Sequence, residues 1–484
     1  MTRNLAAMCI VSLLLGACAG VPDRVPAPAL DDAAPLAGLP HAAAAQWPDA
    51  AWWKRYHDPQ LDRLMRQALT GSTSLKVAHS RVAEAQQAAR VSAASNGVRI
   101  DGNAQLSRQR LSEHGLIPAR FLGFTWYSQA DLGAQLSYSF DWWGKHRASV
   151  EAALGQARAA RASEAAAAIA LQSAVAETYF AWQADQARLA LANRTVTAQR
   201  KLRSIAAARA KAGVDPSDPV LEAEAALAAA RQQRAQLLGM AAIHHASLAA
   251  LLGTSPEALG TLDMHPLPKP DAGLPANAGI DLIARRPDVA ASRWQVESAL
   301  RQTDVARSDF LPDLSLSAMA GLSSIDLDKL FQASSRSFAL TPALHLPIFE
   351  GGLLKARHGL SRAQLDSAIA TYHDSVARAA REVATRTLAV QQLERLSGQQ
   401  QQQLTATRQL AQRSDSRHRR GLTSLAPVLK TRLAVLQQRD SALELAARAL
   451  SADIELIHAL GGGYHSDTTS YPSVSSATRS KAHD

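Results

Sequence analysis

Four stretches of the chain alternate between apolar and polar residues, which is the period of a β-strand with two unlike faces. They are residues 100–107, 131–140, 313–320 and 337–348. The polar positions in the middle of each stretch are small or uncharged. Segments of about 10 residues that are apolar outward and polar inward are typical of transmembrane β-barrels. A soluble hairpin packed on helices is the alternative.

Aromatic residues favour the membrane interpretation, because they gather at both ends of the first hairpin as interfacial girdles do. One group is predicted in the connection between the strands and the other follows the second strand: Phe121, Phe124, Trp126 and Tyr127, then Tyr138, Phe140, Trp142 and Trp143. Pro342, inside the fourth strand, is an irregularity because proline cannot donate to a ladder.

Two long helices are predicted over residues 147–212 and 353–420. Ala, Leu, Gln, Arg and Glu dominate them, and no proline interrupts either one. At about 1.5 Å per residue, some 65 residues span roughly 100 Å. Apolar stripes such as Val175, Ala176 and Tyr179 predict coiled-coil packing. A solitary coiled-coil rod would explain these helices equally well, but it would not explain the strands.

The chain contains an internal repeat, because four landmarks recur 208 positions later. They are Phe140, Gly144, Gly213 and Gly253, followed by Ile348, Gly352, Gly421 and Gly461. Upstream the offset is 212, so the first copy has four extra residues, which we expect in a loop. Each copy is predicted to hold a short helical region, two strands and two helices. We place the copies at residues 51–260 and 279–465.

Residues 1–17 have the features of an export signal, with Arg3 before an apolar run. The sequence Leu15-Gly16-Ala17-Cys18 resembles a lipobox, which predicts cleavage before Cys18 and its acylation. A plain signal peptide with a chance cysteine is the alternative. The other cysteine, Cys9, lies inside the leader, so no disulfide is expected. Ala19 after the cysteine is typical of lipoproteins sent to the outer membrane.

The remaining segments and the composition add little chemistry. Residues 18–50 are predicted to be a lipidated tether, and residues 466–484 a disordered tail. The formal charge is +10, but an exported chain meets no nucleic acid and the basic residues are spread along the helices. We therefore expect no nucleic-acid partner.

Beyond the leader, no stretch approaches the roughly 20 apolar residues of a membrane helix. Any spanning segment is then expected to be a β-barrel. Four strands cannot close such a barrel, whose minimum is about eight, so copies must assemble. Two copies would give eight strands and a filled interior, whereas three would give twelve and leave room for a channel.

Neither catalysis nor cofactor binding is predicted. There are fifteen histidines but no HExxH and no CxxC, and His244 and His245 are adjacent and so point to different faces of a helix. Gly461-Gly462-Gly463 closes a predicted helix instead of opening one, so it is not a phosphate loop. We expect no metal site, no nucleotide site and no enzyme.

Several short segments resemble the outer-membrane factors of tripartite efflux systems, the TolC, OprM and NodT family, over residues 50–465. These segments are Trp52-Trp53, Asp58-Pro59-Gln60-Leu61, Phe140-Asp141-Trp142-Trp143-Gly144, Arg285-Arg286-Pro287-Asp288, Phe310-Leu311-Pro312-Asp313 and Ala459-Leu460-Gly461-Gly462-Gly463. Arg108-Gln109-Arg110, the stretch 322–328 and Gly421-Leu422-Thr423-Ser424 are similar to one multidrug lipoprotein branch of that family.

The resemblance implies an α+β membrane protein in which a long α-helical periplasmic barrel continues into a transmembrane β-barrel, with four strands per chain and twelve in a homotrimer. It also implies lipid anchoring in the outer membrane, a periplasmic adaptor and an inner-membrane pump. The implied function is a passive, gated conduit for drug export. A periplasmic coiled-coil adaptor or scaffold lipoprotein is the alternative, but its strands would not be expected between duplicated helices.

The helix turns at Gly213 and Gly421 would form the periplasmic tip, where members of the family close the tunnel with acidic rings. This sequence departs from that pattern, since Lys430 and Arg432 stand near the usual acidic positions. The candidate gate residues are Asp215, Asp218, Glu222, Asp415, Arg417, Arg420 and Lys430. We hypothesise that Arg417, Arg419 or Arg420 pairs with these acids between subunits. Ordinary solvation of helix ends is the alternative. A basic tip would also attract anions.

Overall fold

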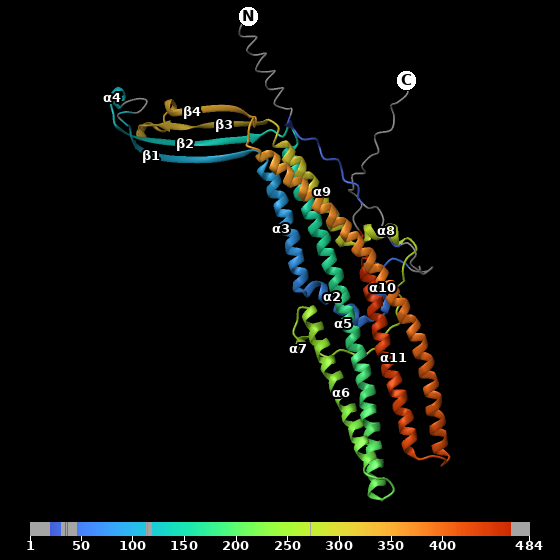
Figure 1. Cartoon of the computed structure of the whole chain (residues 1–484). Helices are drawn as coiled ribbons and strands as arrows, with labels where there is room; N and C mark the ends of the chain where they lie inside the picture. The colour runs from blue at the N-terminus through green and yellow to red at the C-terminus, as the bar shows by residue number, and fades with distance from the viewer. Residues whose placement is uncertain are drawn as a thin grey trace, which may run out of the picture. The chain divides into compact units, whose positions relative to one another are not determined.

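A computed structural model describes residues 20–30, 34, 36, 46–112, 114, 119–271 and 273–465 (Figure 1). The chain forms two compact units, and each unit takes segments from both repeats. The first holds the described residues within 1–30, 81–160 and 292–372, and the second holds those within 31–80, 161–291 and 373–484. Among the described residues, no helix is both long enough and apolar enough to cross a membrane.

The first unit carries one antiparallel sheet of four strands in the order β1-β2-β3-β4. The strands are β1 (Arg99–Arg110), β2 (Trp126–Ser139), β3 (Asp313–Ser324) and β4 (Arg336–His345). The four predicted strands are therefore confirmed, although the fourth ends at His345 instead of position 348, since Pro347 cannot donate to a ladder. Pro342 lies in β4, an outer strand of the sheet, where proline is tolerated.

The register sorts the two faces of the sheet by polarity. Ile100 pairs with Leu136, Leu136 with Ala318 and Ala318 with Leu340, so one row is apolar across all four strands. The neighbouring row on the other face begins with Asp101 paired to Gln135. Because side chains alternate between faces, the period-two pattern of each strand becomes one apolar face and one mainly polar face of the sheet.

The connections between the strands differ in length as the repeat predicted. Residues 111–125 join β1 to β2 and include the short helix α4 (Ala119–Leu122), whereas residues 325–335 join β3 to β4 through η3 (Leu327–Lys329) and η4 (Ala333–Ser335). The first connection is four residues longer than the second. The insertion in the first copy therefore lies in a loop.

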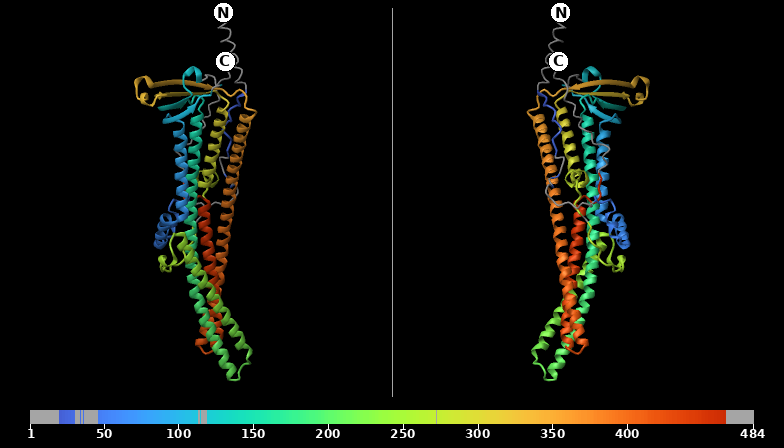
Figure 2. Two further views of the ribbon diagram at one scale, coloured as in Figure 1. Left: turned by 90° about the vertical axis from the view of Figure 1, so that its left-hand side faces the viewer. Right: turned by 90° about the vertical axis from the view of Figure 1, so that its right-hand side faces the viewer.

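The helices follow the duplication closely. The two longest are α5 (Lys145–Lys211) and α10 (Leu353–Arg419), which both have 67 residues and begin and end 208 positions apart. Their partners are α6 (Asp218–Leu251) and α11 (Leu425–Ala459). The two hairpins α5–α6 and α10–α11 are drawn in green and in orange to red in Figure 2. The shorter helices are α2 (Pro59–Gly71), α3 (Thr73–Ser95), α7 (Pro256–Leu259), α8 (Ala278–Arg285) and α9 (Pro287–Ser308).

Small side chains let helices of the first unit approach closely. Ser298 on α9 donates to the carbonyl oxygen of Ala152 on α5 at 2.8 Å. A Cβ added to Gly155 would lie 3.0 Å from the Ser298 Cβ. The alanine-rich composition of α5 is thus used for tight helix packing, and any larger residue at Gly155 would push the two helices apart.

The core of the second unit forms around the short helix η2 (Trp52–Tyr56) and α2. Tyr56 and Phe180 meet edge to face at 5.1 Å. Val175, Ala176 and Tyr179, the stripe predicted on the first long helix, are fully buried in the same cluster. The amphipathic pattern of α5 is therefore confirmed as a packing face.

Candidate functional site: helix tips and open sheet

Both helix tips turn at a glycine in the left-handed region. Gly213 follows α5 with φ of 69°, and its N–H donates to Ala210 while the next residue, Val214, donates to Arg209. Gly421 follows α10 with φ of 73° and has the same pair of bonds, to His418 and from Leu422 to Arg417. This is the Schellman arrangement, which favours glycine. The turns predicted from the repeat are confirmed.

The acids of the first tip differ in their partners. Asp215 accepts two hydrogen bonds from Arg209, at 2.6 and 2.9 Å. These bonds lower the pKa of Asp215 and raise that of Arg209. Asp218 begins α6 and Glu222 follows one turn later, both exposed, and neither has an ion-pair partner in the described part of the chain. Sequence analysis missed Arg209, although its place in the last turn before an acid was a usable signal.

At the second tip Asp415 is paired within its own chain. It contacts Arg432 on α11 at 2.7 Å and Arg419, one helical turn away, at 3.2 Å. The Arg420 Nε atom donates to the Ser416 carbonyl. Arg417 and Lys430 are exposed and, among the described residues, have no ion-pair partner. Asp215 and Asp415 therefore use arginines of the same subunit, and pairing between subunits stays a prediction.

Further along the same helices, a charged cluster joins the two hairpins. Arg188 on α5 donates to both carboxylate oxygens of Asp440 on α11, at 2.8 and 3.0 Å, and contacts Glu444 at 3.4 Å. Glu444 also binds Arg448. The hydrogen bond that Arg188 donates to Asp440 raises the pKa of Arg188. No local spacing relates these residues, so sequence analysis could not find this connection.

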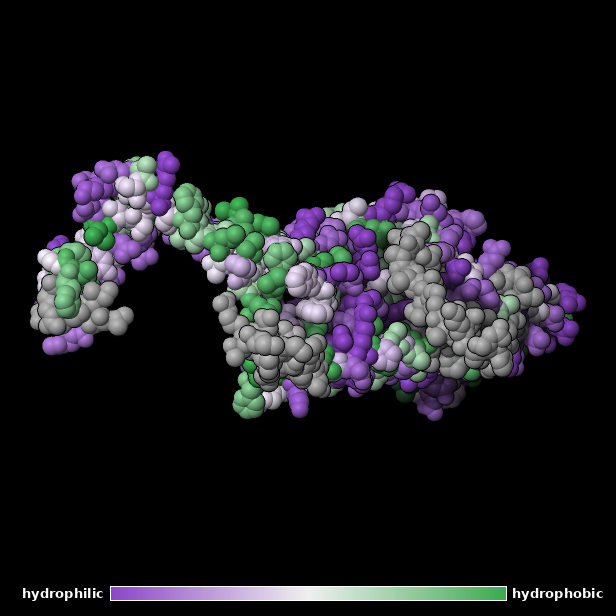
Figure 3. Space-filling model, turned by 90° about the horizontal axis from the view of Figure 1, so that it is seen from above, coloured by the Kyte–Doolittle hydropathy of each residue, from purple (hydrophilic) through white to green (hydrophobic). Residues whose placement is uncertain are grey.

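Large apolar side chains of the sheet are exposed. Phe338 is 76% exposed and Leu340 is 70% exposed. Seen from above, hydrophobic residues lie on the surface beside hydrophilic ones (Figure 3). An apolar face that the described residues do not cover is a candidate contact surface.

Aromatic rings frame the sheet as predicted. After β2, Phe140 packs 4.9 Å from Tyr138 and 6.3 Å from Trp142. At the opposite end Phe124 and Tyr127 are 6.2 Å apart. Trp126 and Tyr127 were expected in the connection between the strands, but both lie inside β2. The reason is that the ladder with β1 extends to Trp126, the first residue of β2.

The segments that carry the family resemblance hold the fold together. Asp58 caps α2 by accepting from the N–H groups of Gln60 and Leu61, and it also accepts from the Tyr179 hydroxyl at 2.6 Å. Trp143 donates to the Pro312 carbonyl at 2.8 Å. These contacts are structural.

Arg286 is the most connected of these residues. Its side chain is 8% exposed and donates to both oxygens of Asp288, to Glu382 at 2.9 Å and to the carbonyl of Ala459 at 2.8 Å. His458, 3.7 Å from Glu382, and then the Arg286 charge lower the pKa of Glu382 to about 2. The guanidinium thus joins α9, α10 and the end of α11.

The glycine run that follows α11 fits against the backbone of Arg285 and Arg286. Gly461 has φ of 92°, and a Cβ there would lie 2.0 Å from the Arg285 carbonyl oxygen. Gly462 and Gly463 likewise have positive φ, and added Cβ atoms would meet Ile169 and Asp49. Only glycine allows both the left-handed turn and this close approach. The run therefore ends a helix, as predicted.

The predicted lipidation site, Cys18, and the signal peptide and tail lie outside the described residues. Parts of the predicted tether are described and contact the folded chain. Arg24 pairs with Asp304 at 3.1 Å, and Trp47 donates to Asn277 at 3.0 Å.

The two adjacent histidines have separate partners. His244 lies 2.7 Å from Asp185, and His245 lies 2.8 Å from the Gly260 carbonyl. They therefore face different directions, as their adjacency on a helix predicted.

A family model described as outer membrane efflux protein matches residues 64–254 and 280–462, one match in each repeat. The multidrug resistance outer membrane protein MdtP of Escherichia coli O6:H1 is 35% identical over 431 residues, which cover 88% of each chain. MdtQ of Escherichia coli O157:H7 is 32% identical over 93% of this chain and 96% of its own. The branch indicated by the short segments is confirmed by the similarity to MdtP.

Solved structures agree with this relationship. The outer membrane protein VceC of Vibrio cholerae matches with a TM-score of 0.76 and 29% identity, covering 86% of this chain and 100% of its own. The outer-membrane channel OprN matches with a TM-score of 0.81 and 25% identity, covering 92% and 99%. With both repeats matched and the four-stranded sheet and long helices in place, this chain belongs to the outer membrane efflux protein family.

Proposed function

We propose that three copies of this chain assemble into the outer-membrane duct of a tripartite pump that exports drugs and other toxic small molecules. A periplasmic adaptor and an inner-membrane pump would be its partners, and the duct itself would be passive and perform no chemical reaction. The observation that carries the proposal is the four-stranded sheet, which has one apolar face and, among the described residues, two outer strands whose outer edges are unpaired.

The apolar face has the height that an outer-membrane barrel requires. Along β2 its residues run from Phe140 to Ala130, and the Phe140 N–H continues the ladder by donating to Leu314. At about 3.3 Å per residue and a tilt of about 40°, this run rises roughly 25 Å, which equals the apolar band of such barrels. Arg108 and Arg336 occupy this face toward the hairpin loops. The apolar band therefore ends where headgroups would begin.

The unpaired edges supply the reason for assembly. The outer edges of β1 and β4 each expose a row of backbone N–H and C=O groups, and such groups cannot stay unpaired in lipid. If β4 of one copy pairs with β1 of the next, three copies close a barrel of twelve strands, which leaves a channel. Two copies would give eight strands, whose interior side chains fill.

Single-channel conductance of the purified protein in planar bilayers tests the proposal, together with its oligomeric mass in the same detergent. We expect large, stable conductance steps from a trimer. A monomer or dimer without channels would overturn it. A sharper variant is Leu340→Lys, which puts a charge on the apolar face next to Ala318. At the middle of a bilayer this costs roughly 2–4 kcal/mol and should reduce membrane insertion, while Thr341→Lys on the opposite face should not.

The export of drugs is proposed from the similarity to proteins named for multidrug resistance. Deletion of the gene should increase sensitivity to the exported drugs, and this chain should restore resistance. A copy carrying Leu340→Lys should restore less than one carrying Thr341→Lys. If both restore resistance equally, the sheet is not the membrane segment.

The proposed gate is the set of charged residues at the helix tips. Arg420 has no carboxylate partner in the described residues, so in a trimer it is free to meet an acid of a neighbour. Arg420→Glu should then raise conductance and drug leakage, with Arg231→Glu on α6 as control. Unchanged conductance would mean that these charged residues do not form a gate and only solvate the helix ends.

The lipid anchor is proposed at Cys18, with cleavage after residue 17. Intact mass of the mature protein should show an acylated N-terminal cysteine. Cys18→Ala should give an unacylated chain, and an unchanged mass increment in this variant would place the lipid elsewhere.

A further inference from the structure

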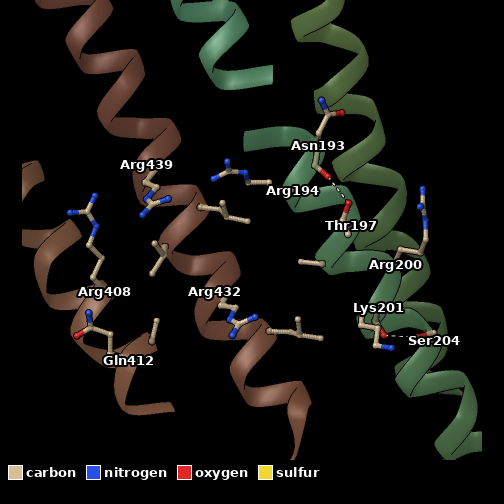
Figure 4. Close-up of a pocket in the computed structure, with 15 residues that line it drawn as sticks. Asn193, Arg194, Thr197, Arg200, Lys201, Ser204, Arg408, Gln412, Arg432 and Arg439 are labelled. Carbon is tan, nitrogen blue, oxygen red and sulfur yellow. Dashed lines mark hydrogen bonds between the residues drawn. The ribbon is translucent and has the colours of Figure 1, made fainter. Parts of the chain in front are cut away.

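A groove of about 1040 Å³ lies within the second unit, between α5, α10 and α11, a few turns from the two helix tips. Its lining contains six cations and no carboxylate: Arg194, Arg200, Lys201, Arg408, Arg432 and Arg439. Figure 4 shows Arg194 extending from α5 toward α11, while Arg432 and Arg439 project from α11. Three helices thus bring one sign of charge to a single hollow.

Most of this charge is not neutralised by the protein. Arg432 pairs with Asp415, but the other five cations of the groove have no ion-pair partner among the described residues. The Nε atom of Arg408 is buried and lacks a hydrogen-bond acceptor. Uncompensated like charges repel each other and raise the local potential, so an anion would be bound favourably.

Three of the other polar side chains of the groove are already engaged. The hydroxyls of Thr197 and Ser204 donate to carbonyls of their own helix at 2.9 and 2.8 Å. The side-chain oxygen of Asn193 accepts from Arg234 at 2.7 Å. The groove therefore offers chiefly donors, and its ligand must supply acceptors.

Between the cations the groove is lined by aliphatic side chains. Leu429, Val435 and Leu436 come from α11, and Ala198 and Ala411 come from α5 and α10. A simple hydrated ion would leave these surfaces wet. An apolar body would cover them, and each Å² of apolar surface removed from water would stabilise the complex by about 25 cal/mol. The lining thus matches a molecule with an anionic head and a hydrophobic body.

We infer that this groove binds amphiphilic organic anions, such as carboxylates or sulfonates with an aromatic or aliphatic body. The bound molecule could be an exported compound or a lipid of the cell envelope, because both share this chemistry. The inference goes beyond the proposed function, and binding is measured without a membrane, so its failure would leave channel formation unaffected.

The test uses the full protein in a neutral detergent with 1-anilinonaphthalene-8-sulfonate as a fluorescent probe and N-phenyl-1-naphthylamine as its uncharged counterpart. We expect saturable binding of the sulfonate that weakens with salt. Arg194→Gln or Arg439→Gln should each weaken it roughly two- to five-fold, as for a partly exposed charge pair. The double variant should weaken it more, and binding of the uncharged probe should not change.

Arg231→Gln is the matched control, because it removes an exposed arginine of α6 outside the groove. The inference is overturned if the sulfonate does not saturate, or if the groove variants bind it like the control. A change of oligomeric mass in the double variant with unchanged sulfonate binding would also overturn it, since a neighbouring subunit would then fill the groove. Displacement by 1-naphthoate but not decanoate indicates an exported aromatic acid, and the reverse indicates a lipid.

Discussion

Replacement of Arg286 by methionine should destabilise the protein more than any single loss of surface charge. Methionine keeps the aliphatic stem but removes every hydrogen bond to Asp288, Glu382 and the Ala459 carbonyl. Ala459 is fully buried, so its carbonyl would lose its donor away from water. Glu382 would also lose the cation nearest to its carboxylate.

The contacts of Arg286 indicate how much stability this variant should lose. An unsatisfied buried carbonyl costs about 1–3 kcal/mol. Breaking a buried ion pair by removing one partner costs about 3–5 kcal/mol, and this range includes the lost hydrogen bonds. With an unfolding entropy of about 2.1 cal/mol/K per residue, a chain of 484 residues loses roughly 1 °C of Tm per kcal/mol. We therefore expect Tm to fall by roughly 3–5 °C.

The assay is thermal unfolding of the purified trimer followed by circular dichroism at 222 nm, at one fixed scan rate because unfolding of such assemblies is often irreversible. Arg381→Met is the control, since Arg381 is exposed and adjacent to Glu382 on the same helix. It should change stability by less than about 0.5 kcal/mol. Equal Tm values for the two variants would refute the structural role assigned to Arg286.

Three further predictions concern pH, the sheet and the first helix tip. The pKa of Glu382 is lowered from 4.5 to about 2, so its contribution to folding stability is complete above pH 4.5 and is lost as pH falls toward 2. Glu382→Gln should therefore flatten the fall of Tm between pH 4.5 and 2, and an unchanged dependence of Tm on pH would contradict the pairing. Gly321→Ala places a Cβ 2.5 Å from a backbone oxygen and should lower the heat resistance of the trimer, whereas Gly102→Ala, which has open space, should not; equal losses would show that crowding is not the cause. Asp215→Asn removes the ionic partner of Arg209, and because that pair is exposed we expect Tm to change no more than in the Arg381→Met control; a clearly larger fall of Tm would mean that the pair is shielded in the trimer.

The sequence alone determined the local elements and their duplication. Period-two alternation identified the strands, since the side-chain period of a strand is fixed by its backbone. Long proline-free stretches identified the helices. The glycines at 213 and 421 located the tips because a left-handed turn excludes most other residues. The fourth strand was predicted too long because the alternation extended past its last ladder residue, His345.

Only the tertiary structure decided which distant residues meet. The pairing of Leu136 with Ala318 depends on the register between a strand of the first repeat and a strand of the second, which no single strand specifies. The charged tips were found from sequence, but the partner of Asp415 on the next helix was not. The basic groove combines residues of α5 with residues of α10 and α11 more than 200 positions later, so its charge has no sequence pattern. Packing of separate helices created it.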